Sequence, residues 1–127
     1  MENRLVGKTE IVVTEADTAA HLGSGFLPVL ATPRLVALME EAACVAISAC
    51  MNEGETTVGT RIDVEHLSAT PVGMRVFAEA SLVAREGRAF SFAIEAFDEA
   101  GLIANATHTR FLVNAAKFLQ KAQEKGK

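Results

Sequence analysis

The chain has 127 residues, of which 50% are hydrophobic, and it carries a formal net charge of −4 at pH 7. This length suits a single domain, residues 1–127, that buries its own core, and the apolar content argues against disorder. The acidic balance argues against the basic surface that is typical of nucleic-acid-binding proteins. Apolar runs are short and interrupted by charge, so neither a transmembrane helix nor a signal peptide is expected, and a cytoplasmic location is the default prediction.

In chain order, residues 5–14 alternate between two sets of side chains and predict a first strand. Residues 15–30 predict no regular element and include the segment Gly23-Ser24-Gly25-Phe26. A glycine-rich segment with an aromatic residue shortly before a helix is typical of a mobile lid. An ordinary connector fits the same segment at least as well.

The longest helical pattern covers residues 32–51, and the rest of the chain is organised around it. Thr32 suits the N-cap position, Pro33 suits the first turn, and Gly54 suits a C-terminal cap. Apolar residues recur at helical spacing and predict one buried stripe: Leu35, Leu38, Met39, Ala42, Ala46 and Ala49. The small alanine side chains in this stripe allow another element to approach closely.

Two adjacent glutamates in this helix face different surroundings. At about 100° per residue, Glu41 shares a polar side with Arg34 and Ser48, whereas Glu40 falls among apolar side chains. A carboxylate among apolar neighbours is costly unless it is hydrogen-bonded. Either Glu40 is a functional group on an apolar face, or it lies at the margin of that face and reaches water.

Four further stretches predict strands, at residues 58–67, 74–85, 88–97 and 102–113, and residues 117–125 predict a short amphipathic helix. The short turns between these stretches favour antiparallel neighbours. One strand, one long helix and four more strands predict an α+β architecture in which a curved antiparallel sheet wraps around a central helix, which is the hotdog fold. Such sheets pair edge to edge across a two-fold axis, so a homodimer is expected.

Two of these strands place ionisable residues on faces with apolar neighbours. Alternation puts His66 at the end of a core-facing row, where a lone histidine is more often a core or rim residue than a catalyst. Gly59 interrupts the same strand, which indicates either close approach of a ligand or a β-bulge. His108 and Arg110 share an apolar face of the last strand, and Arg110 either pairs with a carboxylate or holds a carbonyl or phosphate oxygen.

The two cysteines, Cys44 and Cys50, both lie on the predicted long helix. Their separation argues against a mutual disulfide, and neither has a metal-ligand neighbour at the usual spacing, so buried reduced thiols are expected. The sequence contains no metal-binding, nucleophile-elbow or phosphate-loop motif. No single motif selects a reaction.

Taken in order, the motifs resemble the fluoroacetyl-CoA thioesterase family of hotdog-fold enzymes. The resemblance runs from about residue 6 to the C-terminal helix. Its carriers are Ala31-Thr32, Leu38-Met39-Glu40, Ala42, Cys44, Gly59-Thr60, Val64, His66, Ala69-Thr70-Pro71, Gly73, Glu86-Gly87-Arg88, Thr107-His108, Arg110 and Lys117-Phe118. It implies that Thr32, Glu40 and His66 are catalytic and that Gly59 and Arg110 contact the substrate.

The resemblance implies hydrolysis of a small acyl-CoA without a metal or organic cofactor, since thioester hydrolysis needs only water and acid–base groups. The segment before the helix departs from the fluoroacetyl-specific pattern, because it is shorter and carries one aromatic residue, Phe26, at the gate position. Fluoroacetyl and other short acyl groups therefore both stay open. The alternatives are a non-catalytic acyl-CoA-binding hotdog protein and a hydratase-type enzyme. The hydratase type needs a His and Asp pair near the start of the central helix, and no Asp is expected there.

The implied catalytic residues pose a distance problem. Thr32 and Glu40 are separated by eight residues, or roughly 12 Å along a regular helix. Three arrangements resolve it: a ligand spans the two side chains, a partner chain intervenes, or the helix begins irregularly.

Overall fold

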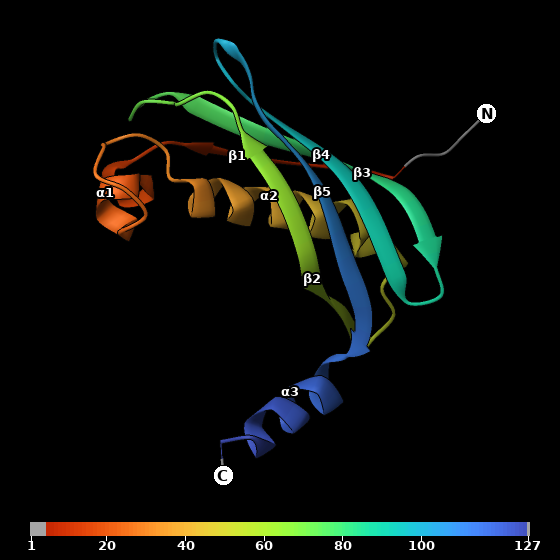
Figure 1. The fold of residues 1–127 in the computed structure, drawn as a ribbon. Helices are drawn as coiled ribbons and strands as arrows, with labels where there is room; N and C mark the ends of the chain where they lie inside the picture. The colour runs from red at the N-terminus through yellow and green to blue at the C-terminus, as the bar shows by residue number, and fades with distance from the viewer. Residues whose placement is uncertain (1–4, 127) are drawn as a thin grey trace, which may run out of the picture.

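The computed structural model describes residues 5–126, which form an antiparallel five-stranded sheet curled around one long helix (Figure 1). The strands lie in the order β1-β3-β4-β5-β2, so β1 and β2 form the two edges. The strands are β1 (Val6–Val12), β2 (Glu55–His66), β3 (Arg75–Glu86), β4 (Ala89–Asp98) and β5 (Gly101–Asn114). The helices are η1 (Glu15–Asp17), α1 (Ala19–Leu22), α2 (Thr32–Ile47), η2 (Ser48–Cys50) and α3 (Ala115–Glu124). The predicted hotdog arrangement is confirmed.

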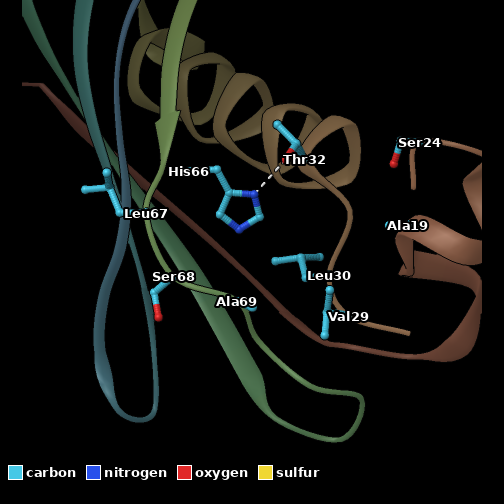
Figure 2. A pocket seen from close by; sticks show the side chains of 9 residues that line it. All are labelled: Ala19, Ser24, Val29, Leu30, Thr32, His66, Leu67, Ser68 and Ala69. Carbon is cyan, nitrogen blue, oxygen red and sulfur yellow. Dashed lines mark hydrogen bonds between the residues drawn. The ribbon is translucent and has the colours of Figure 1, made fainter. Parts of the chain in front are cut away.

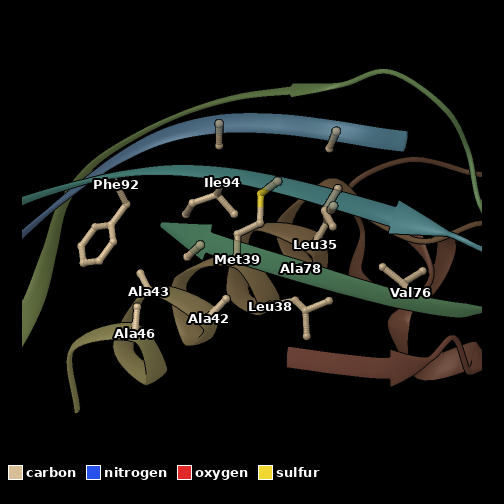
Figure 3. Packing of buried hydrophobic residues seen from close by; sticks show 14 of the residues in the cluster. Leu35, Leu38, Met39, Ala42, Ala43, Ala46, Val76, Ala78, Phe92 and Ile94 are labelled. Carbon is tan, nitrogen blue, oxygen red and sulfur yellow. The ribbon is translucent and has the colours of Figure 1, made fainter. Parts of the chain in front are cut away.

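The core lies between α2 and the concave face of the sheet (Figure 3). α2 packs mainly against β1 and β3, and its sheet-facing stripe is buried. Its buried residues are Leu35, Leu38, Met39, Ala42, Ala43, Ala46 and Ile47. A Cβ at Gly7 of β1 would collide with the backbone of Ala42 and Ala46, so only glycine permits this close crossing of strand and helix.

Both ends of α2 differ from the prediction. The helix begins one residue earlier than expected, because Ala31 takes the N-cap position and Thr32 is the first helical residue. At the other end α2 stops at Ile47 and continues as the 3₁₀ turn η2, so Ala49 is exposed instead of buried. Gly54 has a φ of +84° in the turn before β2 and caps no helix.

A β-bulge in β2 decides which of its side chains face the helix. The pairing of β2 with β5 shifts between Gly59 and Arg61. Before the bulge Thr57 is buried, and after it Ile62 and His66 belong to the inward row. The core-facing row that ends at His66 is confirmed after the bulge, and the bulge beside Gly59 is one of the two alternatives that the sequence left open; the extra residue exchanges the two faces before it.

The side of α2 that is turned away from β1 and β3 remains accessible. Cys44 is exposed and Cys50 is partly exposed, so the expectation of buried thiols was wrong. Val45 is also exposed on this helix. Among residues 5–126, no helix combines the length and apolarity that crossing a membrane requires.

Candidate active site

A histidine and a threonine from distant parts of the chain meet at the first turn of α2 (Figure 2). His66 is the last residue of β2, and its Nδ1 lies 2.8 Å from Oγ1 of Thr32. The pair borders a pocket of about 260 Å³, whose other walls come from the α1 segment, the entry to α2 and the residues after β2, including Ser24, Leu30 and Ser68. The predicted N-cap hydroxyl is therefore engaged with an imidazole.

Only one of the two ring nitrogens of His66 is engaged by Thr32. Its Nε2 is buried and has no hydrogen-bond partner among the residues that the structure describes. Burial also lowers the pKa of His66 below 6.5, since the protonated ring is desolvated. A neutral ring with one unpaired nitrogen in a pocket can accept or donate a proton.

Asp17 ties the segment before α2 to the first turn of this helix. Its Oδ1 accepts a hydrogen bond of 3.0 Å from Nε of Arg34, and its carbonyl oxygen accepts from the N–H of Ala31. Burial alone would raise the pKa of Asp17, but hydrogen bonds from Thr14 and Arg34 outweigh it, so the pKa is lowered. The expectation that no Asp lies near the helix start was therefore wrong, although this one pairs with an arginine.

A second group of residues surrounds the middle of α2. Oε2 of Glu40 lies 3.7 Å from Nη1 of Arg110 on β5, and the side chains are 39% and 9% exposed, respectively. Glu40 is therefore partly exposed and faces a buried arginine, and both alternatives for its role stay open. A Cβ on Gly59 would sit 2.8 Å from Oε2 of Glu40 and 3.2 Å from Nη1 of Arg110. Gly59 thus adjoins the bulge that was one of its two predicted alternatives, and a side chain there would crowd two charged groups.

The guanidinium of Arg110 is held by two residues that the sequence did not single out for this role. Its Nε donates to Oγ1 of Thr57 over 2.9 Å, and its Nη2 donates to the Thr57 carbonyl over 2.9 Å. Its Nη1 lies 3.2 Å from Nε2 of His108. The shared face of residues 108 and 110 was visible in the sequence, whereas the bulge hid the inward direction of Thr57.

The structure brings the six predicted site residues together only in part. Thr32 contacts His66, and Glu40 lies with Gly59 and Arg110. α2 is regular from Thr32 to Ile47, so Thr32 and Glu40 of one chain are roughly 12 Å apart along the axis and an irregular helix start is excluded. The sixth residue stands apart from both groups: Phe26 is 98% exposed, outside the wall of the pocket.

No group of three or more His, Cys, Asp or Glu side chains that suits a metal ion occurs within residues 5–126.

Comparisons of the sequence and of the fold with known proteins lead to the same group of relatives. A family model described as fluoroacetyl-CoA-specific thioesterase matches residues 13–116. The fluoroacetyl-CoA thioesterase of Streptantibioticus cattleyicolor is 38% identical over 122 residues, which cover 91% of this chain and 88% of that protein. A solved structure of the fluoroacetyl-CoA thioesterase FlK matches with a TM-score of 0.91 at 34% identity, over 98% of this chain and 97% of the other. A hot-dog-like protein from Thermanaerovibrio acidaminovorans, at 21% identity, shares the fold with a TM-score of 0.85 over 94% of this chain and 89% of that one.

Sequence likeness and fold likeness extend over nearly the whole described chain and lead to the same relatives. The resemblance that the motifs indicated is therefore confirmed at the level of the family. The chain belongs to the fluoroacetyl-CoA-specific thioesterase family.

Proposed function

We propose that the protein hydrolyses a short acyl-CoA at a site formed by Thr32, His66 and Glu40, and that it acts as a cytoplasmic homodimer. Its family makes the chain an acyl-CoA thioesterase; the site residues, the acyl group and the assembly are the proposal. The observation that carries it is the contact of 2.8 Å between Thr32 Oγ1 and His66 Nδ1 beside a pocket. A hydroxyl and a neutral imidazole at a helix N-terminus suit proton transfer and stabilisation of an oxyanion.

His66 carries the proton in this mechanism. Its lowered pKa keeps the ring neutral at pH 7, so it can take up the proton that the attacking water gives up, directly or by way of Glu40, and deliver it to the sulfur as the C–S bond breaks. Thr32 orients the ring or the thioester carbonyl through its hydroxyl. The first turn of α2 stabilises the negative charge that develops on the carbonyl oxygen. The products are the carboxylic acid and the free CoA thiol.

Glu40 acts either as a nucleophile on the thioester carbon or as a base on the attacking water. It is too far from Thr32 of its own chain for direct contact, so we assign this role to the partner subunit's Glu40. β2 lies at an edge of the sheet, and antiparallel pairing of two copies of β2 would extend the sheet across a two-fold axis. The helix face that carries Glu40 and the His66 end of β2 then meet at one interface.

The remaining predicted residues bind the acyl group. Arg110 offers a positive charge beside Gly59 and Glu40, which suits a small electronegative or carbonyl group. The pocket of about 260 Å³ is below the roughly 300 Å³ at which drug-sized ligand pockets begin, which favours a short acyl chain. Phe26 projects from the segment whose Ser24 lines the pocket, so closure of this segment would cover the acyl group.

Thiol release from a panel of acyl-CoAs tests the function directly. The panel holds acetyl, fluoroacetyl, short branched, long-chain and aromatic esters, and wild type is compared with His66→Ala. We expect turnover of short esters that is lost in the variant. No thiol release from any ester, together with thermal stabilisation by CoA esters, would instead identify a non-catalytic acyl-CoA-binding protein. Stabilisation without thiol release, but with hydration of an unsaturated acyl chain, would identify the hydratase class.

Mixing two inactive variants tests the shared site. Glu40→Gln and His66→Ala are each expected to be inactive alone. In a mixed dimer one site keeps both His66 and the partner subunit's Glu40, so about one quarter of the wild-type activity should return after subunit exchange. If each site lay within one chain, no mixture would regain activity, and a ligand spanning the two groups would become the explanation.

A further inference from the structure

The guanidinium of Arg110 has one defined orientation. Two of its nitrogens donate to Thr57, and the third, Nη1, lies between Nε2 of His108 at 3.2 Å and Oε2 of Glu40 at 3.7 Å. Arg110 is buried, as is Thr57. Because the guanidinium is planar and rigid, its two contacts with Thr57 leave only a tilt about the line through Nε and Nη2, and the acceptor at Nη1 fixes that tilt.

The contacts of His108 determine its protonation state. Its Nδ1 lies 2.7 Å from the carbonyl oxygen of Arg61, which can only accept, so Nδ1 carries the proton. An arginine N–H can only donate, so Nε2 of His108 accepts from Nη1 of Arg110. Both requirements are met by the neutral ring with its proton on Nδ1. His108 is 3% exposed, so water does not replace either contact.

We propose that His108 is a positioning residue: its neutral ring accepts from Nη1 of Arg110 and thereby holds this nitrogen beside Glu40 and Gly59. The inference rests on the proposed function, which gives Arg110 and Glu40 their roles toward the substrate. His108 also borders Gly59, because its Cε1 would lie 3.2 Å from a Cβ there, but both of its ring nitrogens are engaged by Arg61 and Arg110, so its polar effect reaches the site through Arg110. The site accordingly needs an acceptor, and no donor, at the place of Nε2.

Acidification should release Arg110. A protonated His108 would place an N–H against the N–H of Nη1 and a positive charge beside another. The charged or titratable groups that face His108 are Arg110 on β5 and Glu40 on α2, while β2 offers the Arg61 carbonyl and β4 offers the uncharged ring of Phe92. Burial, supported by the charge of Arg110, lowers the pKa of His108 below 6.5, so the neutral ring prevails at pH 7.

Two substitutions separate positioning from a structural role. Gln at position 108 reaches the place of Nε2 and keeps an acceptor for Arg110, whereas Asn keeps a donor near the place of Nδ1 and loses that acceptor. We expect His108→Gln to stay within about threefold of the wild-type kcat/KM, and His108→Asn to lose about ten- to hundredfold. The opposite order would show that the contact with the Arg61 carbonyl matters instead, and would overturn the proposal.

The Nε–H signal of Arg110 in ¹H–¹⁵N NMR provides a readout that does not depend on turnover. It is assigned by its loss in Arg110→Lys. We expect strong protection from hydrogen exchange, relative to free arginine at the same pH, in wild type and His108→Gln at pH 7. Protection should be weaker in His108→Asn, and weaker in wild type as the pH falls through the titration of His108. If hydrogen exchange at Arg110 changed neither in His108→Asn nor with pH, the proposal would be refuted. If the variants do not fold, the pH titration of wild type alone still decides.

Thr57→Val and Thr56→Val complete the experiment as a matched pair. Val at position 57 removes the hydroxyl that accepts from Nε of Arg110, whereas Thr56 is exposed on the same strand and makes no such contact. Only Thr57→Val should speed hydrogen exchange at the Nε–H of Arg110. If wild type releases no thiol from any acyl-CoA while this pattern holds, the proposed function fails and the positioning of Arg110 stands.

Discussion

At the first turn of α2, Thr32 meets His66 through one hydrogen bond, and the other ring nitrogen has no partner in the described part of the chain. In the middle of the same helix, Glu40 faces an arginine whose every nitrogen is engaged. In the first region one hydrogen bond holds a partly exposed histidine. In the second region several hydrogen bonds and an ion pair hold a buried arginine. In the proposed mechanism this difference suits proton transfer at His66 in the first region and a fixed electrostatic environment around Glu40 in the second.

The largest effect is expected where the two regions must cooperate. Glu40→Gln removes the carboxylate but keeps its shape, and we expect kcat to fall by about 10²- to 10⁴-fold. The adjacent Glu41→Gln is the matched control, because Glu41 is exposed on the polar side and should leave kcat unchanged. Thiol release measures both. Normal turnover in Glu40→Gln would confine the chemistry to the first region.

Crowding the second region should cost less. In Gly59→Ala the new Cβ would sit 2.8 Å from Oε2 of Glu40 and 3.2 Å from Nη1 of Arg110, so both charged groups must move. We expect a loss of about ten- to hundredfold in kcat/KM, since displacement of a positioned group weakens catalysis. Steady-state kinetics across the acyl-CoA panel will measure it. Unchanged kinetics would mean that the fixed geometry of this region has no part in turnover.

The single hydrogen bond of the first region gives a smaller effect. Thr32→Val keeps the shape but loses the hydroxyl that contacts His66, and we expect a fall in kcat of about three- to tenfold. Thr32→Ser restores the hydroxyl and should remain close to wild type. Paired kinetic measurements on the two variants isolate the hydroxyl. A loss in Thr32→Ser without a loss in Thr32→Val would assign the role to the methyl group instead.

The smallest effect concerns stability and compares the two histidines. Both have folded-state pKa values below 6.5, so on acidification the unfolded chain binds more protons and the free energy of unfolding falls as the pH drops below about 6.5. His108 is the more buried and contributes at most about 1.4 kcal/mol per pH unit. Urea unfolding between pH 7 and 5 should show a flatter profile in His108→Gln than in His66→Gln. A steeper profile in His108→Gln would reverse the comparison.

Local patterns were sufficient for most of the fold. The apolar stripe of α2, the short turns and the alternating strands predicted a sheet curled around one helix, and the boundaries of β3, β4 and β5 differ from the prediction by at most one residue. The short helix α1 was missed, because four residues carry too little periodicity to stand out. The C-terminal end of α2 was extended too far, since Ala49 continued the apolar spacing after the helix had ended.

The candidate site was predictable as residues but only in part as an arrangement. The motifs named Glu40, His66 and Arg110, and the apolar face of the last strand placed Arg110 beside His108. The pairing of Arg110 with Thr57 was hidden, because the bulge beside Gly59 exchanges the faces of β2. A bulge depends on the partner strand and leaves little trace in the sequence of one strand.

By itself the sequence determined the elements, their faces and the family, because burial repeats with the period of the helix and of the strand and this repeat is local. Tertiary structure alone decided which side chains meet. Thr32 and His66 are 34 residues apart and Thr57 and Arg110 are 53 apart, and both pairs form only once β2 has its register. Register is a property of paired strands, so a single strand cannot specify it.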